Sequence, residues 1–152
     1  MSKPVVLIAD DDPVHLALLA GIFSKSGTAR TLMTMDGLAA LQAVDANSSD
    51  LTLVVLDIHM PGCDGVEVLM SLKDRRYEGG VFIMSSCEVM VPMAKRLALG
   101  LGLNLIGAST KPVDPTLMIS TVEYLESRTA QRPSIAGFVR QYRDEQMQEA
   151  AT

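Results

Sequence analysis

The sequence predicts an α/β protein built on one parallel β-sheet, and two features of the chain lead to this fold class. Short apolar runs of strand length recur five times, and each is followed by a segment with the spacing of an amphipathic helix. Strands that alternate with helices in this way form βαβ units, whose parallel sheet is covered by helices on both faces. At 152 residues and 48% hydrophobic content, the chain is long enough for one domain with a sizeable core.

The strands are expected where aliphatic residues cluster between loop-forming residues. The predicted strands span residues 5–9, 29–33, 51–56, 81–84 and 103–108. The first and third are almost continuously apolar, which is typical of strands buried on both faces of a sheet.

A helix is expected after each strand. Asp12 precedes Pro13, which suits the first helical position, so Asp12 is the expected N-cap of the first helix. In the third helix, Val66, Leu69 and Met70 are expected to face the core. The predicted helices run from residue 13 to a stop at 27, from 37, over 65–73, over about 92–99, and from 115.

The composition changes after Ser127, and the chain is expected to divide there. Residues 1–127 form the predicted domain, and residues 128–152 form a linker followed by a C-terminal helix or tail. Ser134 is the candidate cap of this helix. Apolar residues follow it at helical spacing: Ile135, Phe138, Val139 and Tyr142. So narrow a stripe suits a helix folded against the domain, a dimerisation helix or a connector to an output domain.

Charge, hydropathy and cysteine usage exclude several classes of protein. A net charge of −5 gives no general attraction to nucleic acid or to an anionic membrane. The apolar runs are too short to span a bilayer, and the N-terminus lacks the long apolar segment of a secretory signal. Cys63 and Cys87 form neither a disulfide framework nor a CxxC pair, so a reducing cytoplasm is the expected compartment.

The residues that follow the strands predict a function. The carboxyl ends of parallel strands lie on one edge, and the flavodoxin-like order 2-1-3-4-5 places the first and third strands at the centre. One crevice would then collect the strand-end residues Asp10, Asp11, Asp57, Ser85 and Lys111. Clustered carboxylates repel one another unless a cation is bound, and an open site of this kind suits Mg²⁺. A carboxylate beside Mg²⁺ and lysine can take up a phosphoryl group as an aspartyl phosphate.

Four pieces of sequence resemble the receiver domains of two-component response regulators, the CheY-like family: LIADDDP, LDIHMPGCDG, IMSS and TKP. The resemblance covers residues 5 to about 127. It implies that Asp57 accepts a phosphoryl group from a sensor histidine kinase, a phosphotransfer protein or a small phosphodonor. The implied Mg²⁺ ligands are the carboxylates of Asp10, Asp11 and Asp57 and the backbone carbonyl of His59.

The resemblance also implies roles for the ends of the last two strands. The Ser85 hydroxyl and the Lys111 ammonium would each bind a phosphoryl oxygen, and the Lys111–Pro112 peptide bond would be cis. Such a domain catalyses its own phosphorylation and dephosphorylation and is not otherwise an enzyme. It acts through the face from the fourth strand to the fifth helix, on a partner, an output domain or a second copy.

Two departures from the family pattern concern the switch. Ala108 stands where the family has Tyr or Phe, so the usual coupling of Ser85 to a rotating aromatic ring lacks its ring. The segment between Ser85 and Lys111 is longer than typical, and AKRLALGLGLNLIGASTKP is similar to receivers found ahead of cyclic-di-GMP phosphodiesterase (EAL) domains.

Two other functions compete with the phosphoacceptor switch. A phosphorylation-independent interaction module with a receiver fold is favoured by Ala108 and the unusual fourth segment. A phosphatase with an aspartate nucleophile is disfavoured, because its DxDxT pattern is absent after Asp57. Of the two histidines, His59 is expected to be a solvated loop residue and His15 a structural residue of the first helix.

Overall fold

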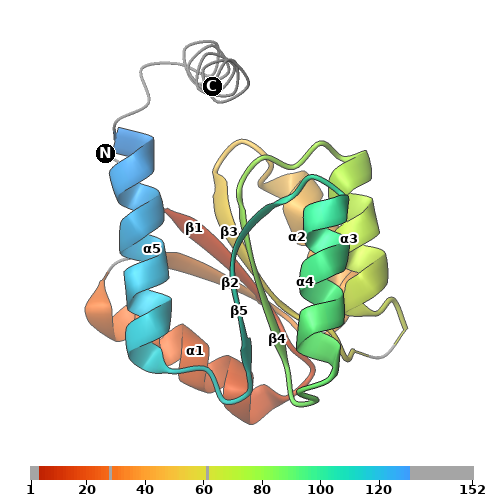
Figure 1. Ribbon diagram of the computed structural model, residues 1–152. Helices are drawn as coiled ribbons and strands as arrows, with labels where there is room; N and C mark the ends of the chain where they lie inside the picture. Colours follow the sequence, from red (N-terminus) through yellow and green to blue (C-terminus); the bar gives the residue numbers. More distant parts are fainter. Residues whose placement is uncertain (1–3, 28, 61, 131–152) are drawn as a thin grey trace, which may run out of the picture.

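The structure, a computed structural model, describes residues 4–27, 29–60 and 62–130 (Figure 1). Within these residues, five strands form one sheet in the order β2-β1-β3-β4-β5, and every neighbouring pair is parallel. The strands are β1 (Val5–Ala9), β2 (Arg30–Thr34), β3 (Leu51–Asp57), β4 (Gly80–Ser85) and β5 (Asn104–Thr110). The helices are α1 (Pro13–Ser26), α2 (Gly37–Ala46), α3 (Gly65–Asp74), α4 (Met90–Gly100) and α5 (Pro115–Ala130). The predicted fold class and strand order are confirmed.

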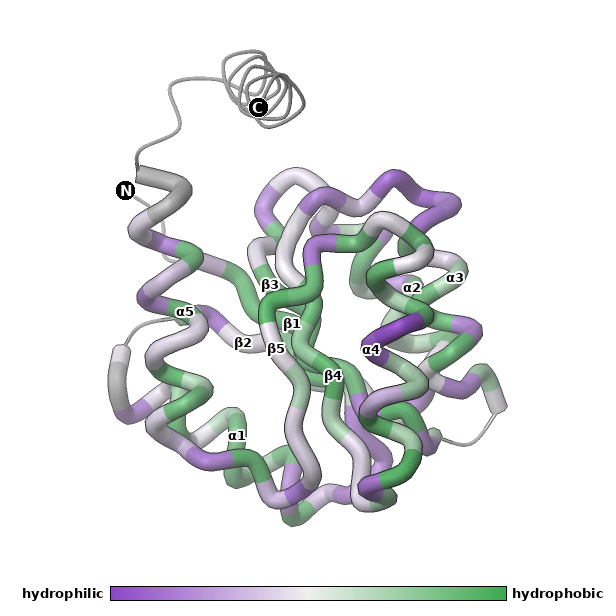
Figure 2. Tube along the Cα trace, viewed as in Figure 1, coloured by the Kyte–Doolittle hydropathy of each residue, from purple (hydrophilic) through white to green (hydrophobic). Residues whose placement is uncertain are grey.

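The helices cover the sheet on both faces, with α1 and α5 on one side and α2, α3 and α4 on the other (Figure 1). Side chains of β1 alternate between the two cores: Ile8 packs with α1 and α5, while Leu7 packs with the other three helices. Every residue of β1 is buried, as expected for a central strand. Figure 2 shows the same feature as hydrophobic colour along the middle of the sheet.

Element boundaries differ from the sequence prediction by a few residues. β2 lies one residue later than expected, β5 continues to Thr110, and α4 begins at Met90. α5 continues to Ala130, so the first three residues assigned to the linker are helical. The first proline after Pro115 is Pro133, so no proline interrupts the helix over residues 128–130. The helix predicted from Ser134 lies outside the described residues.

The buried face of α3 differs from the predicted one. Val68, Leu69 and Leu72 are buried, whereas Val66 packs only at the margin of the core. Met70, expected to face inward, is 51% exposed, so that prediction was wrong. The place where α3 begins against the sheet decides which of its residues face the core. The spacing of apolar residues alone does not reveal that place.

Close backbone contact fixes the start of α3. The Asp64 carboxylate caps the helix by accepting a hydrogen bond from the Glu67 N–H at 3.0 Å. The Gly65 N–H donates to the Ile58 carbonyl at 3.0 Å. A Cβ on Gly65 would lie 2.5 Å from the Ile58 Cα, so a residue without a side chain is required here. The helix is thereby held against the end of β3, which carries Asp57.

None of the helices in the described ranges combines the length and the apolar character needed to cross a membrane.

Candidate functional site

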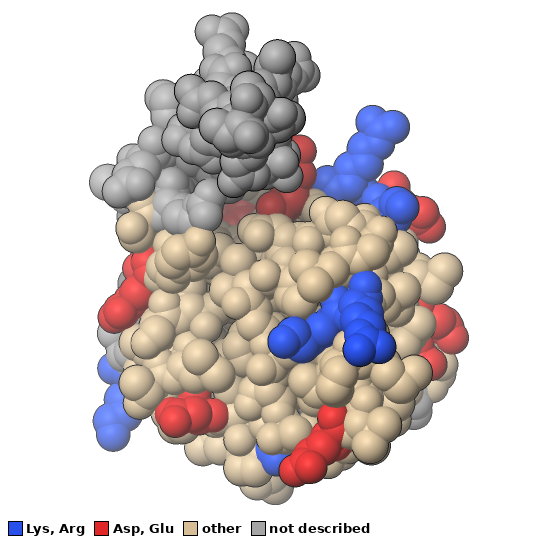
Figure 3. Space-filling model, in the orientation of Figure 1, with Lys and Arg blue, Asp and Glu red and all other residues tan. Residues whose placement is uncertain are grey.

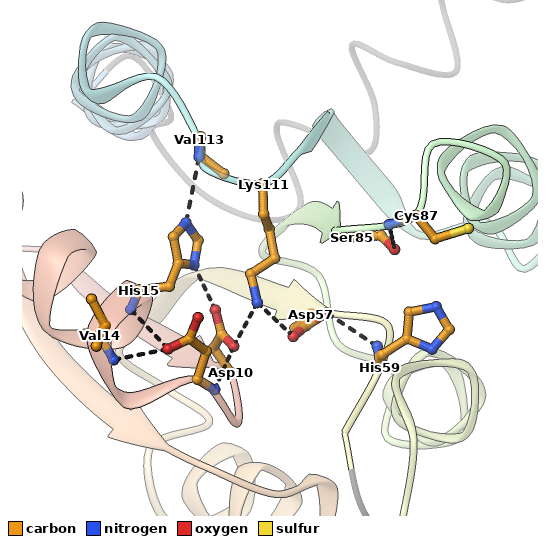
Figure 4. Close-up of polar contacts among 10 residues, drawn as sticks. Asp10, Val14, His15, Asp57, His59, Ser85, Cys87, Lys111 and Val113 are labelled. Carbon is orange, nitrogen blue, oxygen red and sulfur yellow. Dashed lines mark hydrogen bonds and ion pairs between the residues drawn. The ribbon is translucent and has the colours of Figure 1, made fainter.

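Polar residues from four strands converge at the carboxyl edge of the sheet (Figure 4). Asp10 follows β1, Asp57 ends β3, Ser85 ends β4 and Lys111 follows β5. Because β1 and β3 are adjacent and central, their acids lie side by side. The sequence prediction placed these residues at this edge, and the structure puts them there.

Lys111 joins the acids of the two central strands. Its Nζ lies 2.8 Å from Asp10 Oδ1 and 3.0 Å from Asp57 Oδ2. Both carboxylates are buried, Asp57 with 2% of its surface exposed. The Lys111 backbone N–H donates to the Ser85 carbonyl at 2.9 Å, and the Lys111–Pro112 peptide bond is cis, as the resemblance implied. One ammonium therefore compensates two buried carboxylates.

A third carboxylate, that of Asp11, completes an acidic cluster with Asp10 and Asp57. Oxygens of the three residues lie within 4.8 Å of one another, and Asp11 is exposed at the rim. Asp11 and Asp57 line an open cleft of about 500 Å³, as do His59 and Lys111. Oxygen donors beside a cleft that admits water suit Mg²⁺, which keeps part of its hydration shell. The residues present therefore fit Mg²⁺, the metal that the resemblance implied.

The loop after β3 folds back on the candidate phosphoacceptor. The His59 N–H donates a hydrogen bond to Asp57 Oδ1 at 3.1 Å. The two oxygens of Asp57 thus have different partners, a backbone N–H on Oδ1 and an ammonium on Oδ2. The proposed role of the His59 carbonyl as a metal ligand stays a prediction.

The surroundings shift the pKa values of the two buried carboxyl groups, Asp10 and Asp57, in opposite directions. Burial raises the pKa of Asp57, and hydrogen bonds from Lys111 and the His59 N–H offset only part of that effect. Burial also acts on Asp10, but its hydrogen bonds, that of Lys111 foremost, outweigh it and lower the pKa. Burial disfavours the Lys111 ammonium, yet the two carboxylates outweigh it and raise the pKa of Lys111. Of these two carboxylates, Asp57 is therefore the one whose charge the fold compensates less.

His15 belongs to the site, although its place in the sequence predicted only a structural role. Its ring is 5% exposed, with Nδ1 2.5 Å from Asp10 Oδ2, and Nε2 accepts a hydrogen bond from the Val113 N–H at 3.4 Å. Asp12 caps α1 as predicted, accepting from the backbone N–H groups of Val14 and His15. The sequence did contain a signal for this placement of His15. The residue lies in the first turn of a helix that begins directly after the acids at the end of β1.

Ser85 and Ala108 are placed less directly than the acids and the lysine. Ser85 is buried, and its Oγ accepts a hydrogen bond from the Cys87 N–H at 3.0 Å. Ser86, not Ser85, lines the cleft. Ala108 pairs with Ile83 across β4 and β5 and packs against the core beneath α4. The predicted phosphoryl contact of Ser85 and the switch role of both residues stay predictions.

The face formed by α4, β5 and α5 is mostly uncharged, with a small group of basic side chains over α4 (Figure 3). Large apolar side chains on α4 and just before it are exposed, namely Val89, Met93 and Leu99. Lys95 and Arg96 are exposed on the same helix. This is the face that the resemblance implied for read-out.

Comparison with known proteins identifies the family of residues 6–123. The family model of the response regulator receiver domain matches residues 6–123. The "Regulator of RpoS" of Escherichia coli (strain K12) is 35% identical over 104 residues, which are 66% of this chain and 30% of that protein. The chain thus spans about a third of the length of that curated relative.

Solved structures agree on the fold. The receiver domain of the Francisella response regulator 1452 is 28% identical, with a TM-score of 0.71 over 84% of this chain and 99% of that one. A chain of the CheX–CheY–BeF3–Mg²⁺ complex of Borrelia burgdorferi is 26% identical, with a TM-score of 0.67 over 80% and 88%. These matches do not include a receiver that precedes a phosphodiesterase domain among those reported, so that resemblance stays a prediction. A family match that extends from β1 into α5 shows that this chain belongs to the response regulator receiver domains of two-component systems.

Proposed function

We propose that the chain is a phosphoacceptor switch, in which Asp57 takes a phosphoryl group from a sensor histidine kinase or a phosphotransfer protein. The observation that carries this proposal is the setting of Asp57 at the edge of the open cleft. Its carboxylate has a Lys111 ammonium 3.0 Å from Oδ2, and the fold compensates its charge less than that of Asp10. A poorly compensated carboxylate next to a fixed cation is suited to act as a nucleophile.

In the proposed step, a carboxylate oxygen of Asp57 attacks the phosphorus of a donor phosphohistidine. A new P–O bond forms, the P–N bond breaks, and its electron pair returns to the donor imidazole. Lys111 already lies between Asp10 and Asp57, so its ammonium can neutralise a phosphoryl oxygen without a large movement. Mg²⁺ held by Asp10, Asp11 and Asp57 would supply further neutralisation of the transferred group.

The test is phosphorylation by a small donor. With acetyl phosphate and Mg²⁺, intact-mass spectrometry should show one added phosphate per chain, and Asp57→Asn should show none. Asp50→Asn, a change at an exposed loop acid, is the matched control and should take up phosphate like the wild-type chain. A label that persists in Asp57→Asn would overturn the assignment.

A second candidate function is an interaction module that works without phosphorylation. Ala108 favours it, because β5 carries a methyl group where a rotating ring would otherwise report the state of Ser85. Beryllofluoride with Mg²⁺, the combination named for the Borrelia complex, is the suitable phosphoryl mimic. Partner binding that is equal with and without the mimic would favour the module. Binding that changes with the mimic favours the switch, acting through the α4, β5 and α5 face.

The proposed chemistry is one phosphorylation per chain followed by hydrolysis, without turnover of a separate substrate. A cytoplasmic location stays a prediction, since it rests on the usage of Cys63 and Cys87. Homodimerisation and the nature of any output domain also stay predictions.

A further inference from the structure

The His15 ring connects two parts of the site that come from opposite ends of the domain. Nδ1 lies 2.5 Å from Asp10 Oδ2, at the end of β1. Nε2 lies 3.4 Å from the N–H of Val113, in the loop between β5 and α5. Val113 is two residues beyond Lys111, so the ring contacts the acid on one side and the lysine's own loop on the other (Figure 4).

These two contacts define the arrangement of the ring. The Val113 N–H can only donate, so Nε2 must be an acceptor without a proton. The ring proton then lies on Nδ1, which donates to the Asp10 carboxylate. The opposite tautomer would leave Asp10 Oδ2 facing a lone pair and the Val113 N–H facing another proton.

The His15 contact completes the restraint of the Asp10 carboxylate. Oδ1 accepts from Lys111 Nζ at 2.8 Å and from the Asp12 N–H at 2.9 Å, while Oδ2 faces His15. With fixed donors on both oxygens, the carboxylate cannot rotate freely about its Cβ–Cγ bond. Its orientation relative to Asp11 and Asp57 is therefore set partly by His15.

We propose that His15 is a positioning residue of this site. Its Nδ1–H holds the Asp10 carboxylate in the orientation that Mg²⁺ binding requires, and its Nε2 steadies the loop that presents Lys111. His15 acts through these residues, not on the phosphoryl group itself. The part that concerns phosphoryl transfer rests on the proposed function, whereas the part that concerns Asp10 does not.

Replacing His15 by side chains of different shape distinguishes a positioning role from a role in filling the buried space. His15→Leu keeps much of the buried volume and removes both polar contacts. His15→Asn loses volume but places an amide N–H near the position of Nδ1, so it can still donate to Asp10. His15→Gln reaches further and can accept from the Val113 N–H in place of Nε2. Positioning predicts that Asn preserves metal binding better than Leu, and a filling role predicts the reverse.

The first measurement is the tautomer in the full chain. Nitrogen-15 NMR distinguishes a protonated ring nitrogen from an unprotonated one, and a His59→Gln sample identifies which signals belong to His15. We expect the ring proton on Nδ1. A proton on Nε2, or fast averaging between the two nitrogens, would overturn the proposal.

The second measurement is Mg²⁺ affinity, from the shifts of backbone signals as MgCl2 is added. Loss of an outer contact of this kind weakens metal binding by roughly 10- to 100-fold. We expect this loss in His15→Leu and a much smaller one in His15→Asn. Wild-type affinity in His15→Leu, or equal losses in Leu and Asn, would overturn the proposal. If the Leu variant fails to fold, Asn against Gln decides in its place, with Asn expected to bind Mg²⁺ more tightly.

The phosphorylation rate with acetyl phosphate at saturating Mg²⁺ is the third readout. We expect His15→Gln, which can keep the Val113 contact, to be faster than His15→Leu; equal rates would remove the loop-steadying role of Nε2. If the wild-type chain takes up no phosphate, the proposed function fails. The tautomer and the Mg²⁺ titration still decide whether His15 positions Asp10.

Discussion

The Asp57 carboxylate is buried, and its charge is only partly compensated by its neighbours. Its oxygens contact the Lys111 ammonium and the His59 N–H, but Asp10 competes for the same lysine. Burial outweighs these contacts and raises the pKa of Asp57. The fold thus disfavours the charged form of this carboxyl group. A buried charge that is only partly compensated lowers stability and is retained here where the proposed chemistry needs it.

Asp57→Asn should accordingly stabilise the chain in the absence of Mg²⁺. The amide has nearly the same shape and removes the undercompensated charge, leaving Lys111 paired with Asp10. We expect the free energy of unfolding at neutral pH, measured by urea denaturation, to rise by more than the control variant changes it. The control Asp50→Asn should change it by less than about 0.5 kcal/mol. Destabilisation by Asp57→Asn would contradict this account.

The two cysteines should differ in reactivity. Burial raises the pKa of the Cys63 thiol, and the nearby carboxylate of Glu67 raises it further. Cys87 is exposed after β4. At mildly alkaline pH, iodoacetamide should therefore modify Cys87 well before Cys63, as followed by peptide mass spectrometry. Cys63 should become more reactive as the pH rises, because its thiolate fraction grows. Equal rates at mildly alkaline pH would argue against the shift.

At the scale of single elements, the sequence predicted where helices lie better than which side they bury. The predicted α3 was found with nearly the expected bounds, yet Met70 faces solvent and Val68 the core. Apolar residues of α3 occupy more than one side, so spacing alone allows several rows. The row is chosen by tertiary contact, here the approach of Gly65 to the backbone of β3.

Two glycines at helical positions should respond oppositely to alanine. At Gly37, the first residue of α2, a Cβ would lie 2.0 Å from the Cys63 carbonyl oxygen, so Gly37→Ala must displace the loop after β3. We expect a loss of about 1–3 kcal/mol in unfolding free energy. At Gly21, inside α1, the added methyl meets nothing within 4 Å, and Gly21→Ala should gain up to about 1 kcal/mol.

Thermal or urea unfolding of both variants checks this contrast. Both changes add the same methyl group, so a loss at Gly37 beside a gain at Gly21 would indicate the contact with the loop. Equal effects would mean that α2 can move away from Cys63 without cost.

At the scale of the whole molecule, topology made the main part of the site predictable. Asp10, Asp57 and Lys111 each follow or end a strand, and parallel strands bring their ends to one edge. Backbone order alone was enough to bring these residues together. The direction of individual side chains was not predictable in this way. His15 turns towards Asp10, and Ser86 lines the cleft where Ser85 was expected. Such details depend on local turns and caps.

Mg²⁺ should stabilise the folded chain as a whole. The acidic cluster exists only when β1 and β3 are paired, so the ion binds the folded state in preference to the unfolded one. At a hundred times its dissociation constant, a bound ligand adds about 2.7 kcal/mol. The melting temperature should therefore rise with MgCl2, fall again with EDTA, and respond less in Asp11→Asn. An equal rise with NaCl of the same ionic strength would indicate screening only.

The ion pair between Lys111 and Asp10 joins residues 101 positions apart in the chain. β5, which leads to Lys111, is an edge strand and pairs with β4. During synthesis, the acids of β1 and β3 thus emerge long before the cation that compensates them. A chain interrupted ahead of β5 would hold two carboxylates without their ammonium. The proposed phosphorylation site is therefore complete only once the last strand has docked.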